Sequence, residues 1–228
     1  MSALRRAVDW ALRLLYPTRA VCMGCGSLAG CEKDWLCDEC RQALAKRWVG
    51  ARPLPPGGGI DGAAFAYYYQ GPAGGMVRRL KYDGVHRLAE PMARAMAKAE
   101  RFMEPTGAEW IVPVPMHPKR LRQRGFNHAE KLAEAVGAQL GLPCVNALSR
   151  TRNAPQQARL SEEARRANLK DAFAVNRPLE GRRILMVDDV YTTGTTARSC
   201  AQALREGGAA NVYVLCFALA EQDGGQDG

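Results

Sequence analysis

The sequence predicts an α/β domain with a mostly parallel central sheet, preceded by a small four-cysteine module. Apolar runs of strand length alternate along the chain with longer runs that have helical spacing, which is typical of strand–helix–strand units. The run over 211–220 is almost continuously apolar, as expected for a strand covered on both faces of a parallel sheet. Two Cys-x-x-Cys pairs stand ahead of this pattern, within residues 22–40.

The strands are read from apolar runs bounded by turn residues or charges. The clearest ones are an aromatic-rich run, a run that ends at Pro115, and a run that ends in two adjacent acids. Strands are expected over 63–69, 110–114, 143–148, 172–175, 184–187 and 211–220.

The helices are read from apolar spacing and from their caps. Asn127 can cap a helix that has Glu130 three residues on, and Gly141 ends it. Pro91 is tolerated only in a first turn, which places the true start of its helix near Ala89. Helices are expected over 74–82, 86–103, 127–140 and 197–206.

Composition restricts the class of protein and its partners. The chain has 228 residues, 47% of them hydrophobic, and a formal net charge of +9, with more arginine than lysine. Arginine's planar fork suits phosphate, so a polyanionic ligand is expected, although solvated basic faces would give the same charge. Residues 1–16 have the spacing of an amphipathic helix that packs on the protein, and no run has the character of a signal peptide or membrane span. A cytoplasmic location is expected.

The residues over 184–206 give the strongest functional signal. An apolar strand, the acids Asp188 and Asp189, a hydroxyl-rich loop and a helix follow one another. N–H groups converge at a helix start, and the helix dipole adds positive charge there, so this order of residues builds an anion cradle. Gly194 lets a ligand approach the backbone of this cradle closely. Open α/β sheets bind ligands at the carboxyl ends of their strands, where these acids are expected. Ribose 5-phosphate, with a phosphate and vicinal hydroxyls, satisfies both halves.

Other interpretations of this loop are weaker. Threonines that merely cap a helix after an ordinary turn would give a similar pattern. A Walker-type loop is excluded, because no Gly-Lys-Ser/Thr follows.

Two basic segments are candidates to meet the same ligand. Residues 117–128 carry Lys119, Arg120, Arg122 and Arg124 with no acid. We expect them to form a loop that leaves the sheet beside the strand of Asp188, where it could clamp pyrophosphate. Residues 150–168 are expected to be a mobile lid, with a plain surface loop as the alternative. His117 and His128 lack a third ligand nearby and are interpreted as polar surface residues rather than a metal site.

The paired cysteines predict a structural metal site. Two knuckles of this spacing, Cys22 with Cys25 and Cys37 with Cys40, can turn four thiolates toward one Zn²⁺. A redox pair or an iron–sulfur cluster stays open as an alternative. Cys31 is left over between the knuckles and is interpreted as a free thiol, with replacement of one of the four ligands as the alternative.

A proline- and glycine-rich stretch predicts the domain boundary. The expected division is an N-terminal helix and four-cysteine module over 1–50, a linker over 51–59, the α/β domain over 60–222 and a flexible tail over 223–228.

Together these motifs resemble the ComF/GntX family of phosphoribosyltransferase-like proteins, and the matches run in order over most of the chain. They are the cysteine pairs, Lys81–Tyr82–x–Gly84, the Val-Pro-Val-Pro run over 112–115, the Arg-Gly-Phe-Asn run over 124–127, the stretch over 157–168 and the loop after Asp189. The loop resembles the phosphoribosyl pyrophosphate (PRPP) loop of type I phosphoribosyltransferases. The resemblance therefore implies a type I phosphoribosyltransferase-like fold, bound zinc, PRPP with Mg²⁺, and a link to DNA uptake in competence.

The resemblance also implies roles for single residues. Asp188 and Asp189 would hold the ribose 2′- and 3′-hydroxyls during catalysis. The 5-phosphate would lie in a loop made of Val190, Tyr191, Thr192, Thr193, Gly194, Thr195 and Thr196. The pyrophosphate would meet Pro115, Met116, His117, Arg120 and Arg124. No run identifies a pocket for a nucleobase.

Two functions from different classes fit this sequence. The first is an enzyme that transfers the phosphoribosyl group to a nitrogen acceptor and releases pyrophosphate. The second is a non-catalytic PRPP- or nucleotide-binding protein that binds single-stranded DNA or a competence protein through its basic and aromatic residues. A homodimer is a further partner state, since domains of this kind often pair.

Overall fold

The computed structural model describes residues 21–27, 35–54, 57–150 and 172–221. The expected N-terminal helix, Cys31, nearly all of the expected lid and the tail lie outside these residues. Among the described helices, none is both long enough and apolar enough to cross a membrane.

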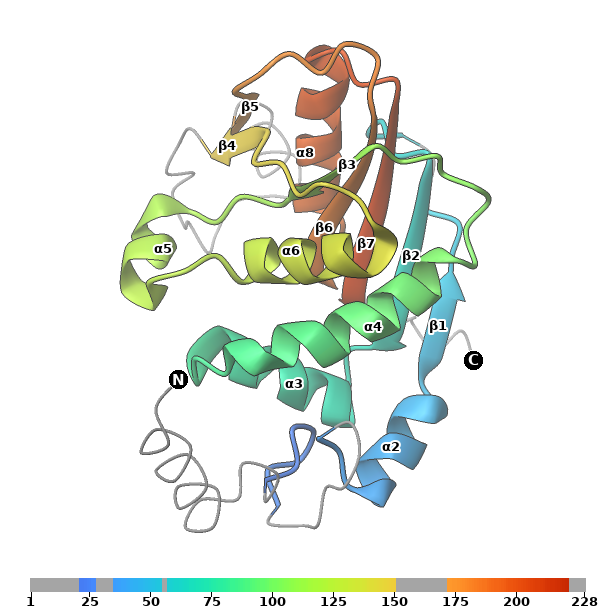
Figure 1. Ribbon diagram of the computed structural model, residues 1–228, viewed down its shortest axis with the longest axis vertical. Coiled ribbons are helices and arrows are strands. Elements are labelled where there is room, and N and C mark those ends of the chain that lie inside the picture. Colours follow the sequence, from blue (N-terminus) through green and yellow to red (C-terminus); the bar gives the residue numbers. More distant parts are fainter. Residues whose placement is uncertain (1–20, 28–34, 55–56, 151–171, 222–228) are drawn as a thin grey trace, which may run out of the picture.

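A five-stranded sheet forms the centre of the molecule (Figure 1), with the strand order β1-β2-β7-β6-β3. Four strands are parallel: β2 (Gly62–Tyr68), β7 (Asn211–Leu219), β6 (Arg183–Tyr191) and β3 (Trp110–Pro113). The edge strand β1 (Trp48–Ala51) is antiparallel to β2. The predicted α/β class with a mostly parallel sheet is confirmed, and β7 is central, as its apolar run indicates.

Helices cover both faces of this sheet. On one face, α3 (Gly71–Tyr82), α4 (Ala89–Glu100) and α6 (His128–Leu140) pack around one apolar cluster; on the other, α8 (Thr195–Glu206) packs around a second. A 3₁₀ turn, η1 (His86–Leu88), precedes α4, so that α4 begins at Ala89 as Pro91 predicts. The Asn127 cap is also confirmed, since its Oδ1 accepts the Ala129 N–H at 3.1 Å.

Three sequence predictions are corrected by the structure. Residues 117–128 are not a continuous loop but contain α5 (Pro118–Arg124), since Pro118 starts the helix, His117 Nδ1 accepts the Lys119 N–H at 3.0 Å, and Gly125 ends it with φ +77°. Strand β6 continues through both acids to Tyr191, because β7 is long enough to pair with it. Residues 143–147 are not a strand and contain one bridge, from Cys144 to Ile111, while Leu148 is the first residue of another strand.

Two short strands lie apart from the main sheet. β4 (Leu148–Arg150) and β5 (Phe173–Val175) pair antiparallel with each other. The predicted strand over 172–175 therefore exists, but its partner is the residues just before the expected lid.

The cysteine segment shares its core with the α/β part of the chain. Cys22, Leu36 and Leu44, the last on α2 (Asp38–Ala45), belong to the same apolar cluster as Met76 and Leu80 of α3. Figure 1 shows α2 and the cysteine-bearing segment beside α3. The division of the chain at residues 51–59 stays a prediction.

Candidate functional site

The loop after β6 has the form of an anion cradle. Gly194 adopts φ +73°, and a Cβ there would lie 2.0 Å from Tyr191 Oη, so only glycine fits. The Tyr191 ring is buried beneath the loop and packs edge-on against Phe65 with centroids 5.3 Å apart. Arg198 Nη2 donates to the Thr193 carbonyl at 2.8 Å, which holds the loop to α8.

The first turn of α8 is open to a ligand. The N-cap residue Gly194 has no side chain to cap this helix, and Thr193 Oγ1 accepts the Thr195 N–H only at 3.5 Å, so the other N–H groups of the first turn point out of the helix start. The hydroxyls of Thr193 and Thr195 share a hydrogen bond of 2.8 Å, and Thr192 and Thr196 line the neighbouring cavities. N–H groups and hydroxyls in this arrangement suit a phosphate.

The two acids face opposite sides of the sheet, because successive side chains alternate along a strand. Asp188 follows the alternation of Met186, which packs toward α8, and Asp189 follows Val187, which packs toward α3 and α6. The two carboxyls are therefore in different surroundings, although they are adjacent in sequence.

Asp189 is buried and already has two basic neighbours. Its Oδ2 lies 2.8 Å from Lys81 Nζ and 3.2 Å from His128 Nε2. Both are ion-pair distances, but neither donor is aligned as a hydrogen bond to this buried oxygen. Asp189 thus ties β6 to the ends of α3 and α6 and keeps unused acceptor capacity.

Asp188 is the more available carboxyl. Its Oδ1 accepts the Asp189 N–H at 2.8 Å, and its side chain lines both cavities of the site. Burial, with a further contribution from the Asp189 charge, raises the pKa of Asp188 to about 8.

The prediction that His128 is a polar surface residue is wrong. Its side chain is buried at the start of α6, and burial lowers its pKa to about 4 in spite of the attraction of Asp189. His128, Leu132 and Val136 lie four residues apart, and this shared helical stripe is the sequence signal that identifies a buried position. His128, Asp188 and Asp189 hold their ligand atoms within 4.8 Å of one another.

An open cleft of about 330 Å³ brings most of the predicted site together. From the sheet side it is lined by Asp188, Asp189, Val190, Thr192 and Thr196, and from the turn and α5 by Pro115, Met116, His117, Arg120 and Arg124. As predicted, the strand before α5 pairs directly with the strand of Asp188. Of the other predicted residues, Tyr191 and Gly194 line a smaller cavity, and Thr193 and Thr195 line neither.

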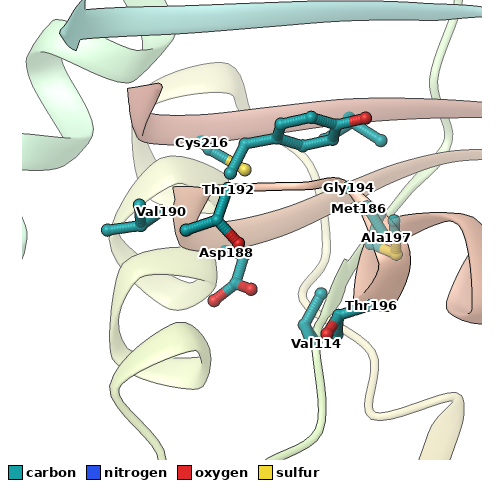
Figure 2. Close-up of a pocket in the computed structure, with 11 residues that line it drawn as sticks. Val114, Met186, Asp188, Val190, Thr192, Gly194, Thr196, Ala197 and Cys216 are labelled. Carbon is teal, nitrogen blue, oxygen red and sulfur yellow. The ribbon is translucent and has the colours of Figure 1, made fainter. Parts of the chain in front are cut away.

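The smaller cavity, of about 50 Å³, lies against the loop. Its lining residues are drawn in Figure 2, where Asp188, Thr192 and Thr196 come from the strand, the loop and the helix respectively. Asp188 therefore joins the cradle to the cleft.

The cleft contains basic residues that sequence reasoning did not assign to the site. Lys81 was noted only as part of a motif, and Arg150 only as the start of the expected lid. Among the described residues, Arg150 Nε has no hydrogen-bond partner, and its guanidinium stacks over Phe173 at 5.3 Å. An arginine that lines a cleft in this way is suited to an anion.

The four paired cysteines converge on one point. The Sγ atoms of Cys22, Cys25, Cys37 and Cys40 all lie within 4.8 Å of one another, and Cys25 and Cys37 are 3.9 Å apart. A tetrahedral Zn²⁺ with bonds of about 2.3 Å separates its sulfurs by about 3.8 Å, whereas a disulfide needs about 2.0 Å. The geometry fits a metal and excludes a disulfide between Cys25 and Cys37.

The backbone favours a thiolate at Cys22, whereas burial raises the pKa of Cys40. Burial opposes ionisation of Cys22, but N–H groups of Cys25, Cys37 and Gly24 outweigh it and lower the pKa of this thiol to about 6. The Cys37 N–H donates to Cys22 Sγ at 3.3 Å. Thiolates held by backbone donors are the ligands that zinc requires.

Comparison with known proteins identifies relatives but no family model that matches. The chain is 34% identical over 154 residues to the DNA utilization protein YhgH of Escherichia coli (strain K12), which covers 65% of this chain and 68% of the relative. It is 31% identical over 161 residues to competence protein F of Haemophilus influenzae, covering 67% and 70% of the two chains. Competence protein ComFC of Bacillus subtilis matches at 37% over 101 residues, covering 44% and 40%.

Solved structures give weaker likenesses. Glutamine PRPP amidotransferase from B. subtilis, complexed with ADP and GMP, aligns with a TM-score of 0.42 at 23% identity, over 60% of this chain and 30% of that one. An allosteric regulatory enzyme of purine biosynthesis aligns with a TM-score of 0.39 at 25% identity, over 61% and 29%. From the sequence relatives, whose length it covers by two thirds or more, the chain belongs to the ComF/GntX family of phosphoribosyltransferase-like proteins.

Proposed function

We propose that this protein binds PRPP and transfers its phosphoribosyl group to a nitrogen acceptor, with release of pyrophosphate. The observation that carries the proposal is the single cleft that joins an open helix start, two carboxyls and a basic helix. PRPP has the three matching parts in the same order: a phosphate, vicinal ribose hydroxyls and a pyrophosphate.

Each part of the site has a role in this proposal. The loop over 192–196 takes the 5-phosphate, and Asp188 contacts the ribose hydroxyls. Asp189 positions β6 through Lys81 and contributes its negative charge to the ring cation of the transition state. Arg120 and Arg124, which line the cleft, stabilise the departing pyrophosphate.

Of the three potential ligands His128, Asp188 and Asp189, Asp188 is the one that suits Mg²⁺. Lys81 Nζ already lies 2.8 Å from Asp189 Oδ2, and imidazole is a poor ligand for Mg²⁺. Mg²⁺ usually takes one or two carboxylates and completes its shell with phosphate oxygens and water. When bound, it would supply positive charge to the leaving pyrophosphate.

We further propose that Cys22, Cys25, Cys37 and Cys40 hold a structural Zn²⁺. The support is the tetrahedral spacing of the sulfurs and the N–H donors around Cys22. All four ligands come from protein, which leaves no open position for catalysis.

The relatives favour a second candidate, a PRPP- or nucleotide-binding protein that acts on single-stranded DNA or a competence partner. Their printed names are a DNA utilization protein and competence proteins, and this chain has a net charge of +9. Basic groups near the cleft would then contact a phosphate backbone.

A PRPP titration followed by a pyrophosphate-release assay separates these candidates, because only the transferase turns bound PRPP over. Calorimetry with PRPP and Mg²⁺ should give binding to the wild type and none to a protein with Asp188→Ala and Asp189→Ala, while circular dichroism shows both folded. Bound PRPP should then yield pyrophosphate with a suitable acceptor. No PRPP binding to the wild type, with oligonucleotide binding that weakens steeply with salt, would replace the transferase by the second candidate.

A further inference from the structure

Two sequence motifs meet across one pocket, and the proposed function leaves their aromatic residues, Tyr82 and Phe126, without a role. Lys81 and Tyr82 come from the end of α3, and Arg124 and Phe126 come from the end of α5 and the turn after it. Together with Arg120 and Gln123 they line a space of about 510 Å³, which is enough for a small planar ligand. We propose that this pocket receives the nitrogen acceptor, and that the acceptor is a planar ring bearing a negative charge.

The aromatic side chains favour a planar ligand. Tyr82 is 69% exposed, so its ring is available for stacking. The Arg124 guanidinium lies 4.7 Å over the Tyr82 ring, and Phe126 meets His86 edge-on with centroids 4.3 Å apart. Rings and guanidinium planes are the surfaces on which flat heterocycles stack, at about 1–3 kcal/mol for each base.

The charges favour an anionic ligand. Lys81, Arg120 and Arg124 line the pocket, and no carboxylate does. Arg120 and Arg124 stand four residues apart on α5, where like charges repel. In the part of the chain that the structure describes, neither has a carboxylate within ion-pair distance. The proposed pyrophosphate would relieve part of this repulsion, and a ring acid would add to that relief, whereas a neutral ring would not.

The position of the pocket suits an acceptor. Lys81, Tyr82, Arg120 and Arg124 also line the cleft of the two acids, so the two spaces lie next to each other. Lys81 Nζ lies 2.8 Å from Asp189, which places this wall of the pocket at the carboxyls proposed to face the ribose. The inference rests on the proposed transfer and names the class of its acceptor.

The transfer step balances with such a ring. A nitrogen of the acceptor, either in the ring or attached to it as an amine, supplies the electron pair of the new bond to C1 of the ribose. The bond from C1 to the pyrophosphate oxygen breaks, and pyrophosphate leaves with that electron pair. An acceptor that carries an N–H passes its proton to the departing pyrophosphate, and nothing is oxidised or reduced.

Ring acids and their uncharged counterparts provide a matched test. Nicotinate with nicotinamide, orotate with uracil, and anthranilate with aniline differ mainly in one carboxylate. Each is titrated into the full-length protein, with and without PRPP and Mg²⁺, and followed by ligand-observed NMR. We expect at least one acid to bind about tenfold more tightly than its neutral partner, which equals about 1.4 kcal/mol.

Variants locate the binding. Tyr82→Ala should weaken the preferred acid by about tenfold or more, and Tyr82→Phe, which keeps the ring, should restore most of the affinity. The control is Phe102→Ala, since Phe102 is 59% exposed but packs beside Trp48 and lines neither space. The Phe102→Ala variant should bind the preferred acid with the same affinity as the wild type.

The outcomes separate this inference from the proposed function. If PRPP binds but no acid is preferred over its neutral partner, or Tyr82→Ala has no effect, the acceptor pocket is wrong and PRPP binding stands. Acid binding that depends on Tyr82 supports the pocket, even in a protein that fails to bind PRPP. An oligothymidylate that binds through Tyr82 while every acid fails would make this surface a nucleic-acid site instead.

Discussion

At the residue scale, Asp188 and His128 are held in opposite protonation states by one buried site. Burial raises the pKa of Asp188 from 3.8 to about 8 and lowers that of His128 from 6.5 to about 4. Asp189 raises both values, whereas Lys81 lowers both, and Arg124 and Arg120 lower that of His128 further. Between pH 4 and 6.5 the ligand-free native state therefore holds the proton on Asp188, and the unfolded chain holds it on His128.

This exchange predicts how stability changes with pH. The stability linked to Asp188 is lost as pH rises toward 8, and the stability linked to His128 is lost as pH falls from 6.5 toward 4. Between pH 4 and 6.5 in the wild type, the change of stability with pH that comes from Asp188 cancels the change that comes from His128. His128→Asn removes the contribution of His128. As pH rises from 4 to 6.5, the unfolding free energy of this variant should therefore fall relative to wild type by up to about 1.4 kcal/mol per pH unit.

The measurement is urea unfolding from pH 4.5 to 7.5 without divalent cations, compared as differences between variant and wild type. Asp188→Asn is the matched variant, and its stability should rise relative to wild type as pH increases, up to about pH 8. Differences that do not change with pH in either variant would contradict the opposed protonation states.

At the element scale, α3 connects the cysteine segment to the carboxyls. A Cβ on Gly75 would lie 2.0 Å from the Gly24 carbonyl oxygen, next to the Cys22–Cys25 knuckle, and Lys81 at the far end of α3 contacts Asp189. A backbone atom on each side leaves little room for adjustment. The knuckle therefore fixes the position of the helix that supplies Lys81.

Neighbouring glycines on α3 give a test of this contact. Gly75→Ala should destabilise the protein by about 1–3 kcal/mol, because the knuckle must move away. At Gly74 a Cβ meets only the flexible end of Arg78 at 3.4 Å, so Gly74→Ala should be neutral or stabilise the helix by up to about 1 kcal/mol. Denaturant unfolding measures both, and equal effects of the two variants would show that the close approach is unimportant.

At the scale of the whole molecule, the cysteine segment and the α/β part share one apolar core. Cys22, Cys37 and Cys40 pack in the cluster that contains Met76 and Leu80 of α3. Damage to the proposed zinc site is therefore expected to spread into α3 but to stop short of the opposite face, where α8 packs in a separate cluster.

Removal of the metal tests this expectation. A zinc chelator should raise amide hydrogen exchange over 21–27 and 35–45 strongly, and over α3 more weakly, because folding of the knuckles depends on the metal. Exchange over α8, which packs in the separate cluster, serves as the internal control and should change little. Unchanged exchange at the knuckles of a protein shown to have lost zinc would mean that the metal does not hold this segment.

The sequence by itself determined the features that depend on neighbours along the chain. Residue types at short spacing predict the cradle, the Asn127 cap, the start of α4 at Ala89 and the convergence of the four cysteines on one point. The order of strands and helices was also visible, because burial on both faces leaves a continuous apolar run. The sequence analysis also expected the segment after residues 111–114 to leave the sheet beside the strand of Asp188, and the two strands do pair.

Only the tertiary structure decided which distant residues meet. The extension of β6 to Tyr191 depends on the length of β7, and the pairing of β4 with β5 joins segments on either side of the expected lid. The burial of His128, the contact of Lys81 with Asp189 and the pocket between α3 and α5 each need helices packed on a common sheet. Contacts between segments remote in sequence leave no periodic signal in either one, so the local pattern named the site and the packing completed it.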